Sequence, residues 1–240
     1  MTAEQVATFR DNGFLTLDRL SSESEIEWLR SVYEDLLADP AGLTIHYEGE
    51  AGPDQVGVID QMFLPDRQCP ELLDTEYINK GRALAAELLG IDAGDVVDGG
   101  LMFIHKPASG GRSAPWHQDE AYWKELGPSR LSHSLSIWMP LDDVTVESGC
   151  MQFIPGTHKS DDVRRHRKPP GMNPIEVDEP FDVGAAVPCP LNAGDATVHH
   201  CRTLHHTAAN TSGRPRRAMT TIFHGPPGVR AEPVDRFWLT

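Results

Sequence analysis

The sequence lacks long apolar runs and paired cysteines. No apolar segment approaches the roughly 20 residues that a membrane-spanning helix needs, so we expect no membrane partner. The four cysteines are scattered, without a C-x-x-C pair and without the dense spacing of a disulfide-stapled secreted domain. The first residues show neither a basic nor an apolar leader region. We therefore expect a cytoplasmic protein with free thiols.

Basic residues are also scarce. The chain has 21 Lys and Arg against 36 Asp and Glu, a formal net charge of −15. Nucleic acids need a positive footprint, so this charge argues against them as partners. The one basic run, Arg164–Lys168, is interpreted as a solvated loop rather than an anion site. We expect a small-molecule substrate, and a monomer or homodimer.

The composition is that of a folded globular protein. Apolar residues make up 39% and charged residues 24% of 240 residues, which predicts one domain over 1–240. Residues 1–95 are predicted to be mainly helical. One helix begins at Thr2, a second at the capping box of Ser22 and Glu25, and a third ends near Gly90.

From residue 96 onward the pattern changes to short segments rich in β-branched and aromatic residues, separated by turn residues. The expected strands are 100–105, 134–139, 150–154, 196–200, 203–208 and 217–223. The sequence therefore predicts a mainly β core behind N-terminal helices. Residues 160–187 contain four prolines, cannot form a central strand, and are predicted to be a lid loop.

The sharpest candidate for chemistry is the motif His117-Gln118-Asp119. On a strand, residues two apart point to the same face, so His117 and Asp119 can bind one ion. The pattern H-x-[DE] is weak evidence alone, since about 1.7 matches are expected by chance. The other match, His46 to Glu48, is interpreted as surface structure.

The partners of this motif lie downstream. Turn residues in 209–215 predict a hairpin loop, and if His205 and Arg216 lie opposite each other across it, they share one face. Two histidines and one carboxylate leave three positions open on a metal, as in non-haem Fe(II) oxygenases. A 2-oxoglutarate would fill two positions and O₂ the third. Arg216 suits the far carboxylate of that cosubstrate.

The chain resembles the phytanoyl-CoA dioxygenase family of Fe(II)/2-oxoglutarate oxygenases. The motifs that carry the resemblance occur in the family's order over most of the chain. They are Phe9-x3-Gly13, Met102 to Pro107, Trp116 to Asp119, Trp138, Ser148 to Lys159, Ala193 to Asp195, and His205-x4-Asn210 with Arg216 eleven residues after the histidine.

The resemblance implies a double-stranded β-helix, that is, a cupin-like jelly-roll core, with Fe(II), 2-oxoglutarate and O₂ as cofactor and cosubstrates. It implies that the catalytic iron ligands are His117, Asp119 and His205. Arg216 would bind the far carboxylate of 2-oxoglutarate. Further cosubstrate-pocket positions are implied at Met102, Gln118, Trp138 and Gln61.

The identity of the distal histidine ligand stays open, and the carboxylate ligand argues against one related reaction. Where the family usually has His-Gly-Ser, this chain has His205-His206-Thr207, so His206 is an alternative distal ligand, although the offsets to Asn210 and Arg216 favour His205. His199 and His200 are reserve candidates. Halogenating relatives replace the carboxylate with a small residue, so Asp119 argues against halogenation.

We therefore expect a dioxygenase that oxidises, and by default hydroxylates, a small molecule, with release of succinate and CO₂, in secondary metabolism. Residues 41–58 and 160–187, with Tyr122 and Trp123, are expected to contact the substrate. One alternative is a cupin-like hydrolase or isomerase that uses the same ligands with Zn²⁺ or Mn²⁺. The other is a non-catalytic binding relative of the same fold.

Overall fold

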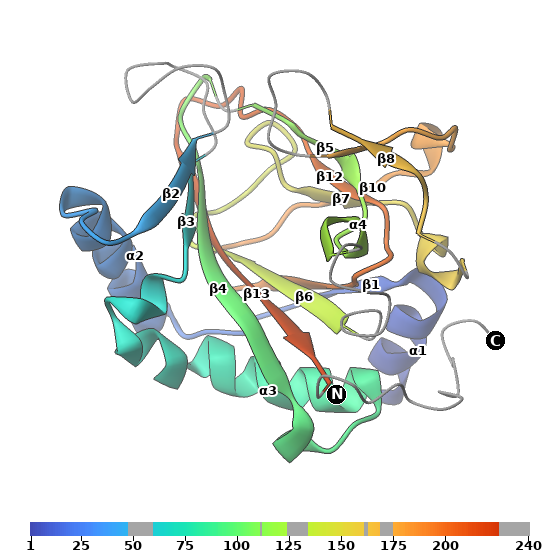
Figure 1. Ribbon diagram of the computed structural model, residues 1–240, viewed down its shortest axis with the longest axis horizontal. Helices are drawn as coiled ribbons and strands as arrows, with labels where there is room; N and C mark the ends of the chain where they lie inside the picture. The colour runs from blue at the N-terminus through green and yellow to red at the C-terminus, as the bar shows by residue number, and fades with distance from the viewer. Residues whose placement is uncertain (48–59, 111, 124–133, 161–162, 169–174, 226–240) are drawn as a thin grey trace.

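The computed structural model describes all residues except 48–59, 111, 124–133, 161–162, 169–174 and 226–240 (Figure 1). Its helices are α1 (Ala3–Asn12), α2 (Glu23–Ala38), α3 (Glu76–Leu89) and the short α4 (Glu120–Trp123). None of the described helices is long and apolar enough to cross a membrane.

Two antiparallel sheets form the core. The larger has the order β1 (Phe14–Leu17), β11 (Ala196–His200), β6 (Ser134–Pro140), β13 (Arg216–His224), β4 (Val97–Lys106), β3 (Asp60–Phe63) and β2 (Thr44–Tyr47). The smaller has the order β10 (Val187–Cys189), β7 (Met151–Phe153), β12 (His205–Thr207) and β5 (Ala114–His117). Figure 1 shows the smaller sheet facing the larger one, with α2 and α3 outside the larger. This arrangement is the predicted jelly roll.

The prediction of a mainly helical section over 1–95 is only partly right. Strand β1 pairs with β11, and β2 and β3 extend the other end of the sheet beside β4. These strands have four residues each, too short to show a clear alternation, and they depend on partners far along the chain. The predicted loop 41–58 contains β2, and its remaining residues from 48 lie outside the described part.

The helix caps show which local signals held. Thr2 and Gln5 form a complete capping box at the start of α1, as the N-cap prediction required. At α2, Ser22 accepts from the Glu25 backbone N–H, but the carboxylate of Glu25 does not return to it. It accepts instead from the backbone N–H groups of Glu76 and Tyr77 at 2.6 and 3.2 Å, at the start of α3. The predicted capping box is therefore half wrong, because packing of the two helices offers unpaired amides to the carboxylate.

The hydrophobic core joins the helices to the large sheet. One cluster of buried residues includes Leu29 of α2, Tyr77 and Leu88 of α3, and Ile137 and Phe223 of the sheet. A second cluster, around Phe153 and Trp138, lies between the two sheets. The single domain over 1–240 stays a prediction, which the shared cluster supports.

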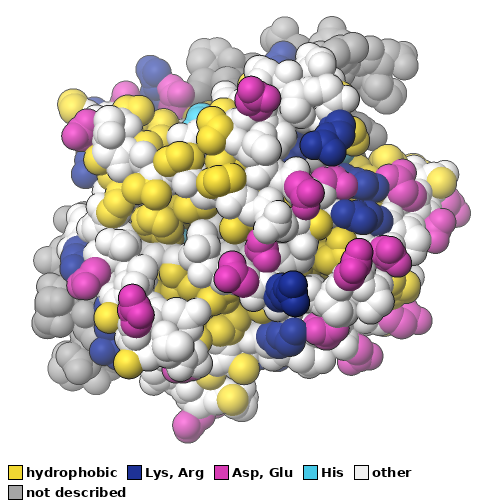
Figure 2. Space-filling model, turned by 180° about the vertical axis from the view of Figure 1, so that it is seen from behind, with side chains coloured by type: hydrophobic (Ala, Val, Ile, Leu, Met, Phe, Trp, Pro, Cys, Tyr) yellow, Lys and Arg dark blue, Asp and Glu magenta, His cyan; other side chains and the backbone are white. Residues whose placement is uncertain are grey.

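The segment 160–187 forms its own two-stranded sheet from β8 (His166–Arg167) and β9 (Glu176–Val177). The three arginines of the basic run, which lie before and on β8, pair with acids: Arg164 with Glu179, Arg165 with Asp178, and Arg167 with Glu176 and Asp178. Much of the positive charge of the run is therefore offset by neighbouring carboxylates. On the face in Figure 2, Lys and Arg side chains likewise lie among Asp and Glu.

One histidine lies differently from its interpretation. The turn Pro155 to His158 was expected to leave His158 at the surface, but this side chain is fully buried and contacts the backbone carbonyl of Arg10 at 3.0 Å. Gly13, which ends α1 with a φ of 81°, lies directly against it, and a Cβ there would meet the imidazole at 2.4 Å. The motif that ends at Gly13 and the motif that contains His158 therefore pack together, away from the proposed metal ligands.

Candidate metal centre

A cavity of about 400 Å³ lies between the two sheets. Side chains of a strand alternate between faces, and the register of the large sheet puts one set of alternate residues on the inner face. Ser136 pairs with His199 and Ile222, and Trp138 with Thr220, which in turn pairs with Met102. The cavity walls from this sheet are Gln61, Phe63, Gly100, Met102, Ile104, Lys106, Ser136, Trp138, His199, Arg216, Thr220, Thr221 and Ile222.

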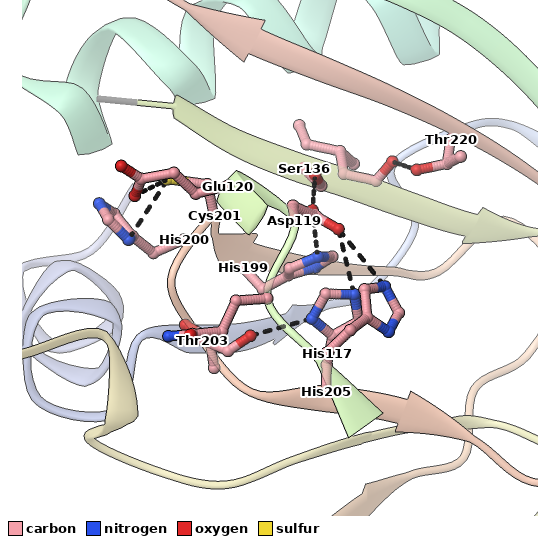
Figure 3. A network of polar contacts seen from close by, with 12 residues as sticks. His117, Asp119, Glu120, Ser136, His199, His200, Cys201, Thr203, His205 and Thr220 are labelled. Atoms are coloured by element: carbon pink, nitrogen blue, oxygen red, sulfur yellow. Dashed lines mark hydrogen bonds and ion pairs between the residues drawn. The ribbon is translucent and has the colours of Figure 1, made fainter. Parts of the chain in front are cut away.

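The three predicted ligands line this cavity, and Figure 3 shows them close together. His117 and His205 are direct partners across the β5–β12 pair. Oδ1 of Asp119 lies 3.6 Å from Nε2 of His117 and 3.3 Å from Nε2 of His205. One ligand atom from each residue lies within 4.8 Å of the others, and no other such group occurs in the described residues. Ligand atoms at right angles around an ion, each about 2.1 Å away, are about 3 Å apart, so the set fits a metal ion.

Asp119 reaches this position by a route different from the one predicted. Strand β5 ends at His117, and Asp119 lies in the turn before α4 rather than on the strand. The turn is held because the backbone N–H of Glu120 donates to the carbonyl of Cys201 and the Glu120 carboxylate pairs with Arg202. Alternation along a strand therefore does not explain the convergence, although the three predicted side chains do lie together as a group that could hold a metal ion.

The two imidazoles are oriented as metal ligands. Nδ1 of His117 contacts the carbonyl of Pro115 at 2.7 Å, and Nδ1 of His205 contacts that of Thr203 at 2.9 Å. Each Nδ1 is therefore the protonated nitrogen, which leaves the Nε2 lone pair toward the cluster.

Burial and mutual charge set the protonation of the cluster. Burial, with the nearby charge of His205, lowers the pKa of His117 to about 3. Burial opposes the charge of Asp119, but the charge of His205 and hydrogen bonds from His199 and His205 hold the pKa of this carboxyl well below its usual value. Burial also lowers the pKa of His205, yet Asp119 raises it more, so the net direction is upward. A metal would therefore meet a carboxylate at Asp119 and would compete with protons for Nε2 of His205.

Arg216 lies in the same cavity but on the opposite sheet. Arg216 pairs with Lys106 of β4 in the large sheet, whereas His205 belongs to the small sheet. The predicted hairpin between the two residues is therefore wrong, because 208–215 cross from one sheet to the other, as jelly-roll connections do. Residues 205 and 216 share a cavity by facing each other rather than by lying side by side.

The guanidinium of Arg216 is buried without a counter-ion among the described residues. The residue is 1% exposed, and its Nε and Nη1 have no hydrogen-bond partner in the described chain. Its carbon Cζ lies 5.3 Å from the ring centroid of Trp138. Burial lowers the pKa of Arg216 to about 10, so it remains charged at neutral pH. A buried cation of this kind calls for an anionic ligand.

The other predicted pocket residues divide into two groups. Met102, Trp138 and Gln61 line the cavity, as expected. Gln118 does not line it: its side chain is buried, donates to the carbonyl of Arg202 and accepts from the backbone N–H of Arg164. Gln118 therefore links Arg164 to the turn that contains Asp119, a role that depends on contacts remote in sequence.

The alternative histidines lie outside the ligand cluster. His206 stacks on Trp116 with centroids 5.0 Å apart, and its Nδ1 contacts the carbonyl of Ala114. His200 contacts the backbone N–H of Arg202. His199 touches Asp119 through Nε2, at 3.2 Å from Oδ2. The structure thus favours His205 as the distal ligand.

The expected substrate walls are partly described. Tyr122 lines the cavity, its ring meets His117 edge-on at 5.5 Å, and its hydroxyl accepts from the backbone N–H of Ile175. Trp123 ends α4, and its side chain lies outside the described part of the structure. Two contacts were missed by sequence reasoning: Ser136, which donates to Asp119, and the buried Lys106, which donates to Thr207. No local motif includes Ser136, whereas Lys106 lies in the motif Met102 to Pro107, to which no such contact had been assigned.

A family model for phytanoyl-CoA dioxygenase matches residues 9–218. Phytanoyl-CoA dioxygenase domain-containing protein 1 of Danio rerio is 36% identical over 129 residues, 51% of this chain, but the match covers less than half of that relative (42%). The Bos taurus protein of the same name is 28% identical over 269 residues, 93% of this chain and 89% of the relative.

Two solved structures are similar over nearly the whole chain. EvdO2 from Micromonospora carbonacea var. aurantiaca, crystallised with 2-oxoglutarate, is 32% identical with a TM-score of 0.79, over 100% of this chain and 97% of that one. SnoK, a non-heme alpha ketoglutarate dependent carbocyclase from nogalamycin biosynthesis, is 26% identical with a TM-score of 0.69, over 98% and 90%.

Proposed function

Because this chain belongs to the phytanoyl-CoA dioxygenase family, we propose that it is an Fe(II)- and 2-oxoglutarate-dependent dioxygenase that hydroxylates a small organic molecule and releases succinate and CO₂. One observation carries the proposal. Three metal-ligand side chains, His117, Asp119 and His205, share a cavity with the buried guanidinium of Arg216, two of whose nitrogens have no hydrogen-bond partner in the described chain.

The two imidazoles and one carboxylate would hold Fe(II) on one face and leave the opposite face for small ligands. When bound, the iron couples the oxidative decarboxylation of 2-oxoglutarate by O₂ to oxidation of a substrate C–H bond. The chain's own task is to hold and orient. The backbone carbonyls of Pro115 and Thr203 fix the two imidazoles, and the cavity walls exclude water from the reaction.

Arg216 would bind the far carboxylate of 2-oxoglutarate through its Nε and Nη1. This contact satisfies a cation that is otherwise buried without a partner in the described chain. Trp138 stacks against the guanidinium and limits its rotation. We assign Met102 and Gln61 to the remaining wall of the cosubstrate subsite, since both line the cavity on the same sheet face.

We propose a substrate of natural-product size with little charge. Beyond the subsite of Arg216, the walls are largely apolar, from Phe63, Ile104, Met151 and Ile222. Coenzyme A thioesters carry several phosphate charges, and the three arginines of the basic run that could meet them already pair with acids within residues 176–179. The similarity to SnoK, which comes from nogalamycin biosynthesis, supports secondary metabolism as the setting. Cytoplasmic location and a monomeric or homodimeric state stay predictions.

Two alternatives make different demands on the same residues. A Zn²⁺- or Mn²⁺-dependent hydrolase or isomerase would use the three ligands but leave Arg216 without a purpose, although burying such a cation costs stability. A non-catalytic binding relative would need 2-oxoglutarate or substrate affinity but no turnover.

Anaerobic addition of Fe(II) and 2-oxoglutarate distinguishes all three. We expect the weak visible charge-transfer band of the chelate, and then succinate and CO₂ when O₂ is admitted. The band should be absent in a hydrolase or isomerase, and a band without succinate would identify a binding protein. His117→Ala should abolish Fe(II)-dependent succinate formation. A mass-spectrometric screen of natural-product-sized candidates should then find one that stimulates succinate release and gains one oxygen atom.

A further inference from the structure

The two oxygens of Asp119 have different surroundings. Oδ1 faces Nε2 of His117 and His205, whereas Oδ2 turns the other way. Oδ2 accepts a hydrogen bond from Oγ of Ser136 at 2.6 Å and lies 3.2 Å from Nε2 of His199 (Figure 3). The carboxylate is therefore divided between a metal-facing oxygen and an oxygen held by the protein.

Ser136 and His199 are brought together by the sheet itself. They are direct partners in the register of β6 and β11, so their side chains point to the same inner face. Both are buried, at 4% and 2% exposure. They come from the large sheet, whereas the histidine ligands come from the small one. Asp119, in the turn after β5, spans the space between the two sheets.

We propose that Ser136 and His199 form a clamp that keeps Asp119 bound to the metal through Oδ1 alone. A free carboxylate can rotate and bind an ion through both oxygens, which would use a position that 2-oxoglutarate or O₂ needs. With Oδ2 held by two hydrogen bonds, that rotation is prevented. Ser136 and His199 are positioning residues, because they act through Asp119.

The clamp also ties the metal ligands to the cosubstrate anchor. Trp138, two residues after Ser136 on the same face of β6, stacks on Arg216. The strand that holds Asp119 therefore also positions the guanidinium. Loss of the clamp would loosen the distance between the metal and Arg216, which one molecule of 2-oxoglutarate must span.

The inference rests on the proposed function, so its first test uses a metal alone. Apoprotein is titrated with Co(II) by calorimetry, without 2-oxoglutarate. Removal of an outer hydrogen-bond partner of a metal ligand typically costs 10- to 100-fold in affinity, and we expect this loss in the double variant Ser136→Ala/His199→Leu. His199→Gln returns an N–H donor at a similar reach and should stay within about threefold of wild type.

A matched control separates the clamp from general damage to the sheet. Thr197 lies on the inner face of β11, is fully buried, and its hydroxyl has no hydrogen-bond partner in the described chain. Thr197→Val should therefore leave Co(II) affinity unchanged. His205→Gln, which removes a proposed ligand, should abolish stoichiometric binding. Thermal melts of each apoprotein show whether a variant is folded.

The outcomes separate the possibilities. Unchanged Co(II) affinity in the double variant would overturn the clamp, and complete loss in His199→Leu, as in His205→Gln, would make His199 a ligand instead. With saturating Fe(II) under anaerobic conditions, the concentration of 2-oxoglutarate for half-maximal chelate should rise about tenfold in His199→Leu. If this 2-oxoglutarate concentration does not rise although Co(II) affinity is lowered, the clamp does not serve to keep Asp119 bound through one oxygen. If wild type forms no chelate, the proposed function fails, while the Co(II) result still tests the clamp.

Discussion

Replacing Arg216 with methionine should make the apoprotein more stable and should raise the concentration of 2-oxoglutarate that the enzyme requires. The charged guanidinium is buried, and burial lowers its pKa from 12.5 to about 10. That difference corresponds to about 3 kcal/mol of destabilisation of the folded state. Because the folded-state pKa is below the unfolded one, the cost applies in full below about pH 10 and fades as the pH rises toward 12.5.

The variant Arg216→Met removes this cost while keeping much of the side-chain volume. Loss of the stacking on Trp138 offsets about 1 kcal/mol, which leaves a net gain of about 2 kcal/mol. For a chain of this size the gain raises Tm by about 4 to 8 °C. Without the charge-assisted contact, worth about 1.5 to 3 kcal/mol, the requirement for 2-oxoglutarate should rise about 10- to 150-fold.

Thermal melts of metal-free protein and the 2-oxoglutarate dependence of succinate formation measure the two effects. Arg217→Met is the matched control, since Arg217 is the next residue, faces the other way and pairs with Asp142 and Glu34 at 2.7 and 2.8 Å. It should lower Tm and leave the cosubstrate requirement unchanged. A Tm for Arg216→Met at or below wild type would refute the charge-burial argument, and an unchanged requirement for 2-oxoglutarate would refute the role of Arg216.

Three further predictions follow from the site and its supports. His205→Gln should lose Fe(II)-dependent succinate formation, whereas His206→Gln should keep stoichiometric Co(II) binding; the reverse pattern would make His206 the ligand. Asp119 raises the pKa of His205, and a metal competes with the proton on this imidazole. Co(II) affinity measured by calorimetry should therefore fall up to tenfold per pH unit below the pKa of His205. An affinity that does not change with pH would contradict this. Gly13→Ala should cost about 2 to 4 kcal/mol in urea unfolding because of its positive φ and the clash with a buried ring, whereas Gly213→Ala, with no atom within 4 Å, should change stability by less than about 0.5 kcal/mol; equal effects would refute the packing argument.

Local chemistry explains the predictions that held. Thr2 caps α1 and Gly90 ends α3 in the left-handed conformation, because caps depend on residues within one turn of the helix. The strands β4, β6, β11 and β13 were found close to their bounds, because each contains an uninterrupted run of strand-forming residues. Strands β1, β2 and β3 were missed, since their four residues become strands by pairing with neighbours.

Residue types, their order and their spacing along the chain were enough to propose which side chains bind a metal and a dicarboxylate: His117, Asp119, His205 and Arg216. How these side chains meet depends on the fold: a turn rather than a strand presents Asp119, and His205 and Arg216 face each other from different sheets. The fold also decided that Gln118 points away from the cavity and that Ser136 and His199 hold Asp119. Such contacts join residues tens of positions apart, and their geometry depends on sheet register, which no local pattern specifies.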